Sequence, residues 1–225
     1  MSNSKVAIVF DLDGTLVHSM PDLRIALNKV LVEEGRRECS PEEVVLMVGD
    51  GVPTLIRLGF EATGDDPGED KREEVRKRFM SYYAGPMPNT FPWDGVIETL
   101  DKLKAAGHPM AVCTNKPFEA TKALCDQLDL TKYFDSIVGG DTCATKKPEP
   151  EMLYKCMEEM GSTKDNTIML GDSLNDVKVC RNAGIPVGVV SFGYSRGVPV
   201  PELGTDDVID HFSDLMDLVQ KYGNA

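Results

Sequence analysis

Short apolar runs alternate with helical patterns along this chain. Residues 6–10 are all apolar and end abruptly at Asp11, which predicts a strand buried on both faces of a parallel sheet. Helical patterns lie between such runs, for example over 94–106, where Gly107 follows as a terminating glycine. The alternation predicts an α/β fold with a doubly wound, Rossmann-like parallel sheet. The other strand-like runs are residues 109–113, 136–138, 167–170, 186–190 and, more weakly, 207–209.

One long segment interrupts this alternation. Residues 17–92 contain helix signals but no convincing strand, and a crossover between neighbouring strands needs far fewer residues. We therefore expect a small all-helical domain over 17–92, inserted after the first strand, and an α/β core domain made of 1–16 and 93–225. The helices of the insert are expected over 19–34, from a capping box at Ser40, over 51–60 and over 68–83.

Composition and charge indicate a globular protein and argue against some classes of partner. With 225 residues, 41% of them hydrophobic and 27% charged, the chain can build a full hydrophobic core. Its 24 basic and 37 acidic side chains give a net charge of −13, which argues against nucleic acid and anionic membrane as partners. No apolar run reaches the ~18 residues of a membrane span. Six scattered cysteines without zinc spacing favour a cytoplasmic protein. For its assembly, a monomer and a homodimer are both open.

Carboxylates stand where two of the strand-like runs end. Asp11 and Asp13 follow the first run, and Asp172 and Asp176 follow the fourth. Open parallel sheets bind ligands at this edge, and clustered carboxylates are typical ligands of Mg²⁺. Each pair also has a simpler explanation, since D-x-D-G occurs in calcium-binding turns and acidic residues favour helix N-termini.

Thr114, Asn115 and Lys147 add groups that could bind an anion. Thr114 and Asn115 follow the second run and open a helix, where a hydroxyl and free backbone N–H groups can hold an anion. Lys147 precedes another helix, and its ammonium suits a phosphoryl oxygen or a carboxylate. An N-cap threonine and a solvated lysine pair explain the same residues in isolation, so the order of the motifs carries more information than any one of them.

In this order the motifs resemble the haloacid dehalogenase-like phosphohydrolase superfamily. The matching residues are Asp11-Leu12-Asp13-Gly14-Thr15-Leu16, Thr114-Asn115, Lys147-Pro148, and Gly171-Asp172 with Asp176. The helical insert resembles the cap domain of that superfamily, and the resemblance covers essentially the whole chain. Among its members the phosphoglycolate phosphatases are most similar, through residues 48–51, 91–92, 138–141, 147–150 and 191–194.

The resemblance implies a Mg²⁺-dependent phosphatase that hydrolyses a small phosphomonoester, 2-phosphoglycolate, to glycolate and phosphate. Asp11 is the implied nucleophile and would carry an aspartyl-phosphate intermediate. Asp13 is the implied acid and base, which protonates the leaving oxygen and then activates water. Asp11, the backbone carbonyl of Asp13, and Asp172 are implied to hold the Mg²⁺.

The other matching residues have implied roles around the phosphoryl group. Thr114, Asn115 and Lys147 are implied to bind its oxygens, and Lys147 also to offset developing charge. Asp176 is implied to have an indirect role, in which it orients metal-bound waters or Lys147 without contacting the substrate.

A glycine-flanked turn, Gly49-Asp50-Gly51, is the candidate loop with which the cap selects the substrate. A plain turn between helices explains this segment as well. Asp50 departs from the small polar residues usual near this position in phosphoglycolate phosphatases, so a different substrate or a simple solvent-exposed acid are both open here.

Other functions on the same scaffold stay open. A phosphosugar mutase, or a phosphatase of a sugar phosphate or nucleotide, fits the same motifs, and Thr15 favours a phosphatase only weakly. A dehalogenase has no oxygen leaving group for Asp13 to protonate, and a response-regulator receiver has no cap. A panel of phosphate esters distinguishes these alternatives.

Overall fold

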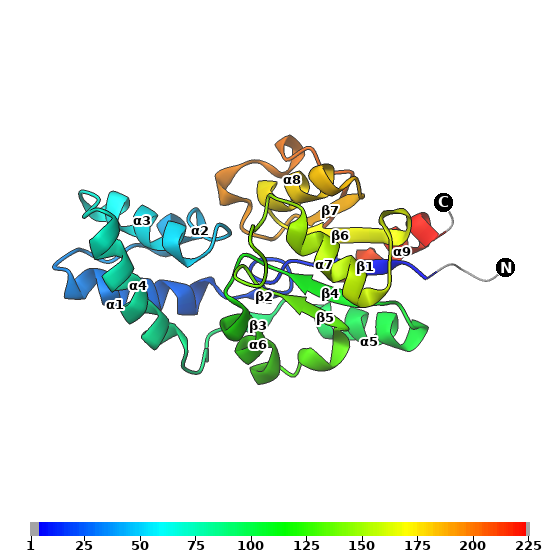
Figure 1. The fold of residues 1–225 in the computed structure, drawn as a ribbon, viewed down its shortest axis with the longest axis horizontal. Coiled ribbons are helices and arrows are strands. Elements are labelled where there is room, and N and C mark those ends of the chain that lie inside the picture. The colour runs from blue at the N-terminus through cyan, green and yellow to red at the C-terminus, as the bar shows by residue number, and fades with distance from the viewer. Residues whose placement is uncertain (1–4, 224–225) are drawn as a thin grey trace.

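The core is a six-stranded sheet in which every neighbouring pair of strands is parallel (Figure 1). The computed structural model describes residues 5–223, so residues 1–4 of the expected core and residues 224–225 lie outside the described part. This sheet confirms the predicted α/β fold. Across the sheet the strands are β5 (Ser136–Val138), β4 (Met110–Cys113), β1 (Ala7–Phe10), β6 (Thr167–Gly171), β7 (Val187–Val190) and β8 (Asp207–Ile209).

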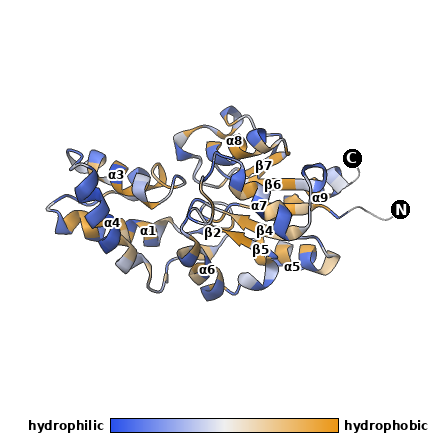
Figure 2. Cartoon of the chain, viewed as in Figure 1, coloured by the Kyte–Doolittle hydropathy of each residue, from blue (hydrophilic) through white to orange (hydrophobic). Residues whose placement is uncertain are grey.

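Helices cover both faces of the sheet, which explains why its strands lack polar alternation. Ile8 and Phe10 of β1 pack with α5, α6 and α9, whereas Val9 packs with α7 and α8 on the other face. Figure 2 shows the central strands as hydrophobic. The helices are α5 (Val96–Ala106), α6 (Phe118–Gln127), α7 (Glu151–Met160), α8 (Leu174–Ala183) and α9 (Leu215–Gly223). Single 3₁₀ turns occur at Thr131–Tyr133, Lys164–Asn166, Ser195–Gly197, Val200–Glu202 and Phe212–Asp214.

The insert is a bundle of four helices that lies beyond the carboxyl ends of the strands, at the left of Figure 1. Ser40 begins the second helix with the predicted capping box: Glu43 N–H donates to Ser40 Oγ at 3.3 Å, and Ser40 N–H donates to the Glu43 carboxylate at 2.8 Å. Leu27, Phe60 and Phe79 are buried between the helices. The four are α1 (Met20–Glu33), α2 (Pro41–Val45), α3 (Val52–Thr63) and α4 (Glu69–Tyr83).

The two chain crossings between core and insert correct one expectation. We expected no strand within 17–92, but β2 (Val17–His18) and β3 (Phe91–Pro92) pair as a short antiparallel ribbon. The two crossings leave the core side by side, so their backbones form hydrogen bonds with each other. A strand of two residues is too short to show an alternation of apolar and polar residues in the sequence. Trp93 reinforces the ribbon, since its indole N–H donates to the Gly14 carbonyl at 3.1 Å. The domain boundaries at 16/17 and 92/93 stay a prediction.

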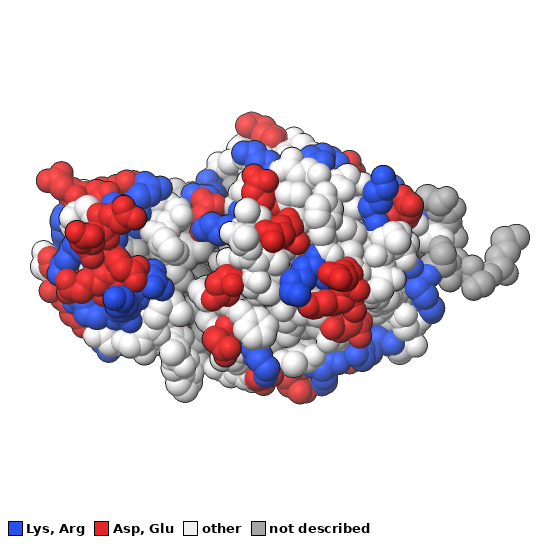
Figure 3. Space-filling view, viewed as in Figure 1, with Lys and Arg blue, Asp and Glu red and all other residues white. Residues whose placement is uncertain are grey.

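Charged side chains of both signs crowd the surface of the insert (Figure 3). Many form ion pairs, such as Arg76–Glu73 at 2.6 Å and Lys71–Glu34 at 3.0 Å. Exposed pairs of this kind stabilise a fold by less than about 1 kcal/mol each, so they serve mainly to keep the surface hydrated. Within residues 5–223, no helix has the length and apolar composition needed to cross a membrane.

Candidate active site

Segments far apart in the sequence meet at the carboxyl edge of the sheet. Asp11 follows β1, Thr114 follows β4 and Asp172 follows β6, while Lys147 comes from the segment between β5 and α7. All four residues are buried. Because the strands are parallel and adjacent, residues that follow them lie at one edge, and the expected motifs therefore come together.

Lys147 is the cation at the centre of this edge. Its ammonium lies 2.9 Å from Asp11 Oδ1 and 2.7 Å from Asp176 Oδ1. Burial lowers the pKa of Lys147, but the two carboxylates outweigh that effect and raise it well above its ordinary value. Lys147 therefore stays charged and cannot act as a base here.

The carboxylates around Lys147 carry more negative charge than it neutralises. Burial, reinforced by the charge of Asp176, raises the pKa of Asp11 to about 6 in spite of Lys147. Burial likewise raises the pKa of Asp172 well above its ordinary value, and the charges of Asp176 and Asp11 add to this. Such a site favours a further positive charge, which would restore the ionised form of both acids.

A divalent cation fits this cluster. Asp11, Asp172 and Asp176 each offer a carboxylate oxygen, and these oxygens lie within 4.8 Å of one another. Asp11 Oδ1 is buried without an aligned hydrogen bond from any residue of 5–223, although Lys147 Nζ is close to it. Asp176 is already engaged, since its oxygens accept bonds from Lys147, from Ser173 Oγ at 2.7 Å and from Ser173 N–H at 3.0 Å. Asp11 Oδ1 is therefore open to a cation such as Mg²⁺, and Asp172 Oδ1 accepts only a long bond of 3.3 Å from Thr15 Oγ1, so it can be a ligand as well.

Two glycines allow Asp172 to reach its position. A Cβ on Gly14 would lie 2.2 Å from Asp172 Oδ2, and one on Gly193 would lie 2.2 Å from Asp172 Cβ. Gly14 also has a φ of +94°, which other residues rarely adopt. The Tyr194 N–H donates to Asp172 Oδ2 at 2.8 Å and holds the carboxylate in place. The sequence reasoning gave Tyr194 no such role.

Asn115 connects the core to the insert. Its side-chain NH₂ donates to the Gly49 carbonyl at 3.1 Å and to the Lys147 carbonyl at 3.2 Å. Its Oδ1 is buried and has no hydrogen-bond partner among residues 5–223. The neighbouring Thr114 lines the same pocket as Asp11 and Asp13. The structure thus brings Thr114 and Asn115 to the site, as expected, and adds a contact with the cap loop.

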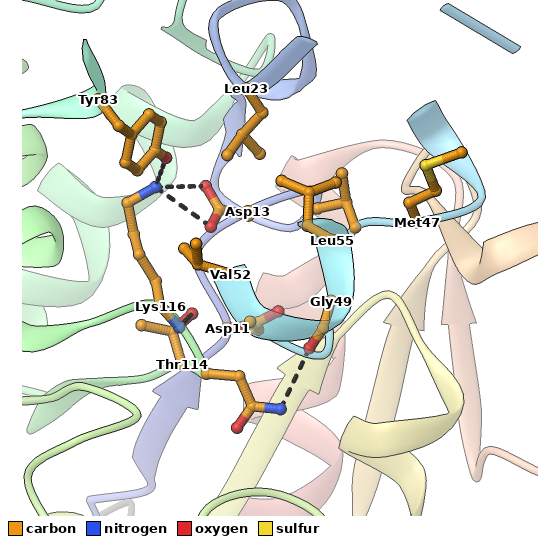
Figure 4. Close-up of a pocket in the computed structure, with 13 residues that line it drawn as sticks. Asp11, Asp13, Leu23, Met47, Gly49, Val52, Leu55, Tyr83, Thr114 and Lys116 are labelled. Carbon is orange, nitrogen blue, oxygen red and sulfur yellow. Dashed lines mark hydrogen bonds and ion pairs between the residues drawn. The ribbon is translucent and has the colours of Figure 1, made fainter. Parts of the chain in front are cut away.

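Lys116 and Tyr83 were not among the expected site residues. The Lys116 ammonium lies 3.1 and 3.3 Å from the two Asp13 oxygens and donates to the hydroxyl of Tyr83 from the end of α4 (Figure 4). Lys116 is buried although it is a lysine. The only sequence signal was its place directly after Thr114-Asn115, whereas nothing in the sequence connects Tyr83 to Asp13.

A pocket lies between core and insert above Asp11 and Asp13 (Figure 4). Together with the open space at its mouth it measures about 410 Å³. The core supplies its polar side, and the insert supplies an apolar wall. That wall consists of Leu23, Met47, Val48, Val52 and Leu55.

The glycine-flanked turn lies at the mouth of this pocket. Gly49 and Gly51 line it, but Asp50 does not. The Asp50 carboxylate instead accepts hydrogen bonds from Asn175 and Arg196 of the core, and its carbonyl accepts one from Lys146 at 2.7 Å. Asp50 therefore joins the insert to the core and is not among the residues that line the pocket.

Comparisons with known proteins agree with this geometry. Residues 8–190 match the sequence model of the haloacid dehalogenase-like hydrolases. The phosphoglycolate phosphatase of Rhodospirillum rubrum is 40% identical over 216 residues, which span 94% of this chain and 89% of that protein. A solved structure described as a predicted phosphoglycolate phosphatase from Haemophilus somnus has a TM-score of 0.89 at 29% identity, over 98% of this chain and all of that one. CbbY from Rhodobacter sphaeroides, solved in complex with phosphate, has a TM-score of 0.75 at 27% identity, over 94% of this chain and 96% of that one.

Proposed function

Because this chain belongs to the haloacid dehalogenase-like hydrolase family, we propose that it hydrolyses 2-phosphoglycolate to glycolate and phosphate with Mg²⁺. It is a phosphoric monoester hydrolase, and the proposal concerns its substrate, its metal and its covalent intermediate. The observation that supports it best is the buried group of Asp11, Lys147 and Asp172, of which Asp11 also lines the pocket between core and insert.

Asp11 is the proposed nucleophile. One of its oxygens attacks phosphorus, the bond from phosphorus to the ester oxygen breaks, and an aspartyl phosphate forms. Asp11, the Asp13 backbone carbonyl and Asp172 are the proposed holders of Mg²⁺. When bound, the ion supplies positive charge that lets a carboxylate approach an anionic phosphoryl group.

Asp13 is the proposed acid and base. Its carboxyl lines the same pocket as that of Asp11 and is more exposed than it. It donates a proton to the leaving alkoxide and then removes one from the water that hydrolyses the aspartyl phosphate.

Lys147, Thr114 and Asn115 are the proposed ligands of the phosphoryl oxygens. Lys147 is held charged by Asp11 and Asp176, so it can offset the charge that develops during transfer. Asp176 fixes the position of Lys147 and is itself held by Ser173.

The lining of the pocket supports a small substrate. The apolar wall from the insert offers no partners for the several hydroxyl groups of a sugar or a nucleotide. This wall favours a short leaving group over the sugar phosphates and nucleotides that the motifs also fit.

Phosphate release from a panel of esters tests the proposal. The purified protein should release phosphate from 2-phosphoglycolate with Mg²⁺ and not with EDTA, and Asp11→Asn should abolish release. Glu158→Gln, the same change of charge at an exposed residue of α7, is the control. Activity that survives in Asp11→Asn would refute the assignment of the nucleophile. A sugar phosphate or nucleotide that is turned over about tenfold better, a gap of about 1.4 kcal/mol, would refute the substrate.

A further inference from the structure

Lys116 and Tyr83 form a pair of donors in the pocket that the reaction described above does not use. Lys116 follows β4 in the core, and Tyr83 ends α4 in the insert, and the two side chains meet at one side of the pocket (Figure 4). We propose that Lys116 and Tyr83 bind the carboxylate of the leaving group and so select a phosphorylated hydroxy acid over an uncharged ester of the same size. This inference rests on the proposed function.

The position of Lys116 matches the place where that carboxylate must lie. Asp13 lies beside the ester oxygen if it protonates the leaving group. In 2-phosphoglycolate the carboxylate is separated from this oxygen by a single CH₂ group. The Lys116 ammonium lies 3.1 and 3.3 Å from the Asp13 oxygens, in the same pocket that Asp11 lines. A carboxylate at that separation therefore reaches Lys116 while the phosphoryl group rests on Asp11.

The rest of the pocket offers no competing cation. Of the residues that line it, all within the described 5–223, Lys116 is the only one with a positive charge. The insert contributes the apolar wall, so an anion in this part of the pocket must be satisfied by Lys116 or by the hydroxyl of Tyr83. Burial strengthens the attraction, since Lys116 has only 2% of its side chain exposed.

Both side chains have donor capacity left for a ligand. The two distances from Lys116 Nζ to the Asp13 oxygens are longer than the ~2.7–2.9 Å of strong charge-assisted bonds. The Asp13 carboxylate therefore binds the ammonium loosely, and the ammonium can also donate to a ligand. The Tyr83 oxygen accepts from Lys116, which leaves its own O–H without an acceptor among residues 5–223. Burial raises the pKa of Tyr83 well above its ordinary value, and the hydroxyl therefore remains a donor.

Two substrates that differ only at the carboxylate test the inference. 2-Hydroxyethyl phosphate replaces the carboxylate of 2-phosphoglycolate by CH₂OH and keeps the scissile bond. We expect Lys116→Met to reduce the preference for 2-phosphoglycolate, measured as the ratio of the two kcat/KM values, by about 10- to 100-fold. Tyr83→Phe, which keeps the ring that Lys116 overlies, should reduce it about fivefold.

Matched variants separate recognition from other effects. Lys116→Arg keeps the charge and should restore part of the preference. Lys122→Met removes an exposed lysine of α6 and should leave the ratio unchanged. An equal loss for both substrates in Lys116→Met and Tyr83→Phe would overturn the inference and leave the proposed function intact. A wild-type enzyme that turns over both esters equally well would also overturn the inference, whereas a wild-type enzyme that releases no phosphate from 2-phosphoglycolate would refute the proposed function itself. If Lys116→Met does not fold, the ratio for Tyr83→Phe decides between these outcomes.

Discussion

Replacing the buried carboxylate Asp11 by its neutral isostere should stabilise the protein while it abolishes activity. Burial raises the pKa of Asp11 from its ordinary 3.8 to about 6, and this value already includes the attraction of Lys147. Keeping Asp11 ionised in the folded state therefore costs about 3 kcal/mol at neutral pH. Asn cannot ionise, so Asp11→Asn should raise the free energy of unfolding by about this amount in the absence of metal.

The pH dependence has a defined sign. Below pH 3.8 the carboxyl is protonated in both the folded and the unfolded chain, so the variant has no advantage. The advantage should grow between pH 3.8 and about 6, where only the unfolded chain ionises freely, and level off above that range. For a chain of this length about 3 kcal/mol corresponds to a rise of about 6–12 °C in the unfolding temperature.

Thermal and urea unfolding in EDTA, at several pH values, measure this difference. Glu158→Gln removes an exposed carboxylate and should unfold like the wild type throughout. An Asp11→Asn variant that is no more stable than the wild type at pH 7.5 would contradict the reasoning. It would mean that the Lys147–Asp11 ion pair contributes more than the burial of the charge costs.

Three further predictions concern the metal and the cap. Mg²⁺ at about 100 times its dissociation constant should raise the free energy of unfolding by about 2.7 kcal/mol, and calorimetry should show that Asp172→Asn loses this gain. Gly14→Ala should abolish the same gain, because its Cβ would lie 2.2 Å from Asp172 Oδ2. Asp50→Ala removes contacts with Asn175 and Arg196 and should raise KM about fivefold, roughly 1 kcal/mol, with kcat little changed in steady-state assays. A KM that stays at the wild-type value would show that these contacts do not hold the cap closed.

The pattern of apolar runs predicted the sheet well because parallel strands need buried residues on both faces. The run at 6–10 became the central β1, and even the weak run at 207–209 became the edge strand β8. The pattern did not predict the ribbon of β2 and β3, since a strand of two residues shows no apolar run or alternation in the sequence. Helices of the insert began one residue later than expected at Gly51 and Gly68, because these glycines have φ values of +83° and +88° and act as N-caps.

The cap loop shows where the resemblance reached its limit. The sequence singled out Gly49-Asp50-Gly51 but could not say which of its residues face the ligand. The glycines line the pocket, and Asp50 contacts Arg196, 146 positions away in the chain. The cytoplasmic location and the choice between monomer and homodimer stay predictions.

By itself, the sequence determined which residues stand at the strand ends and in what order. This followed from local causes: apolar runs form the strands, and the parallel sheet brings the residues that follow them, Asp11, Thr114 and Asp172, to one edge. Only the tertiary structure decided that Lys116 meets both Asp13 and Tyr83. The contact with Asp13 depends on the pairing of β1 with β4, and the contact with Tyr83 depends on how the insert is oriented over the core. Both result from packing between distant segments that no local pattern records.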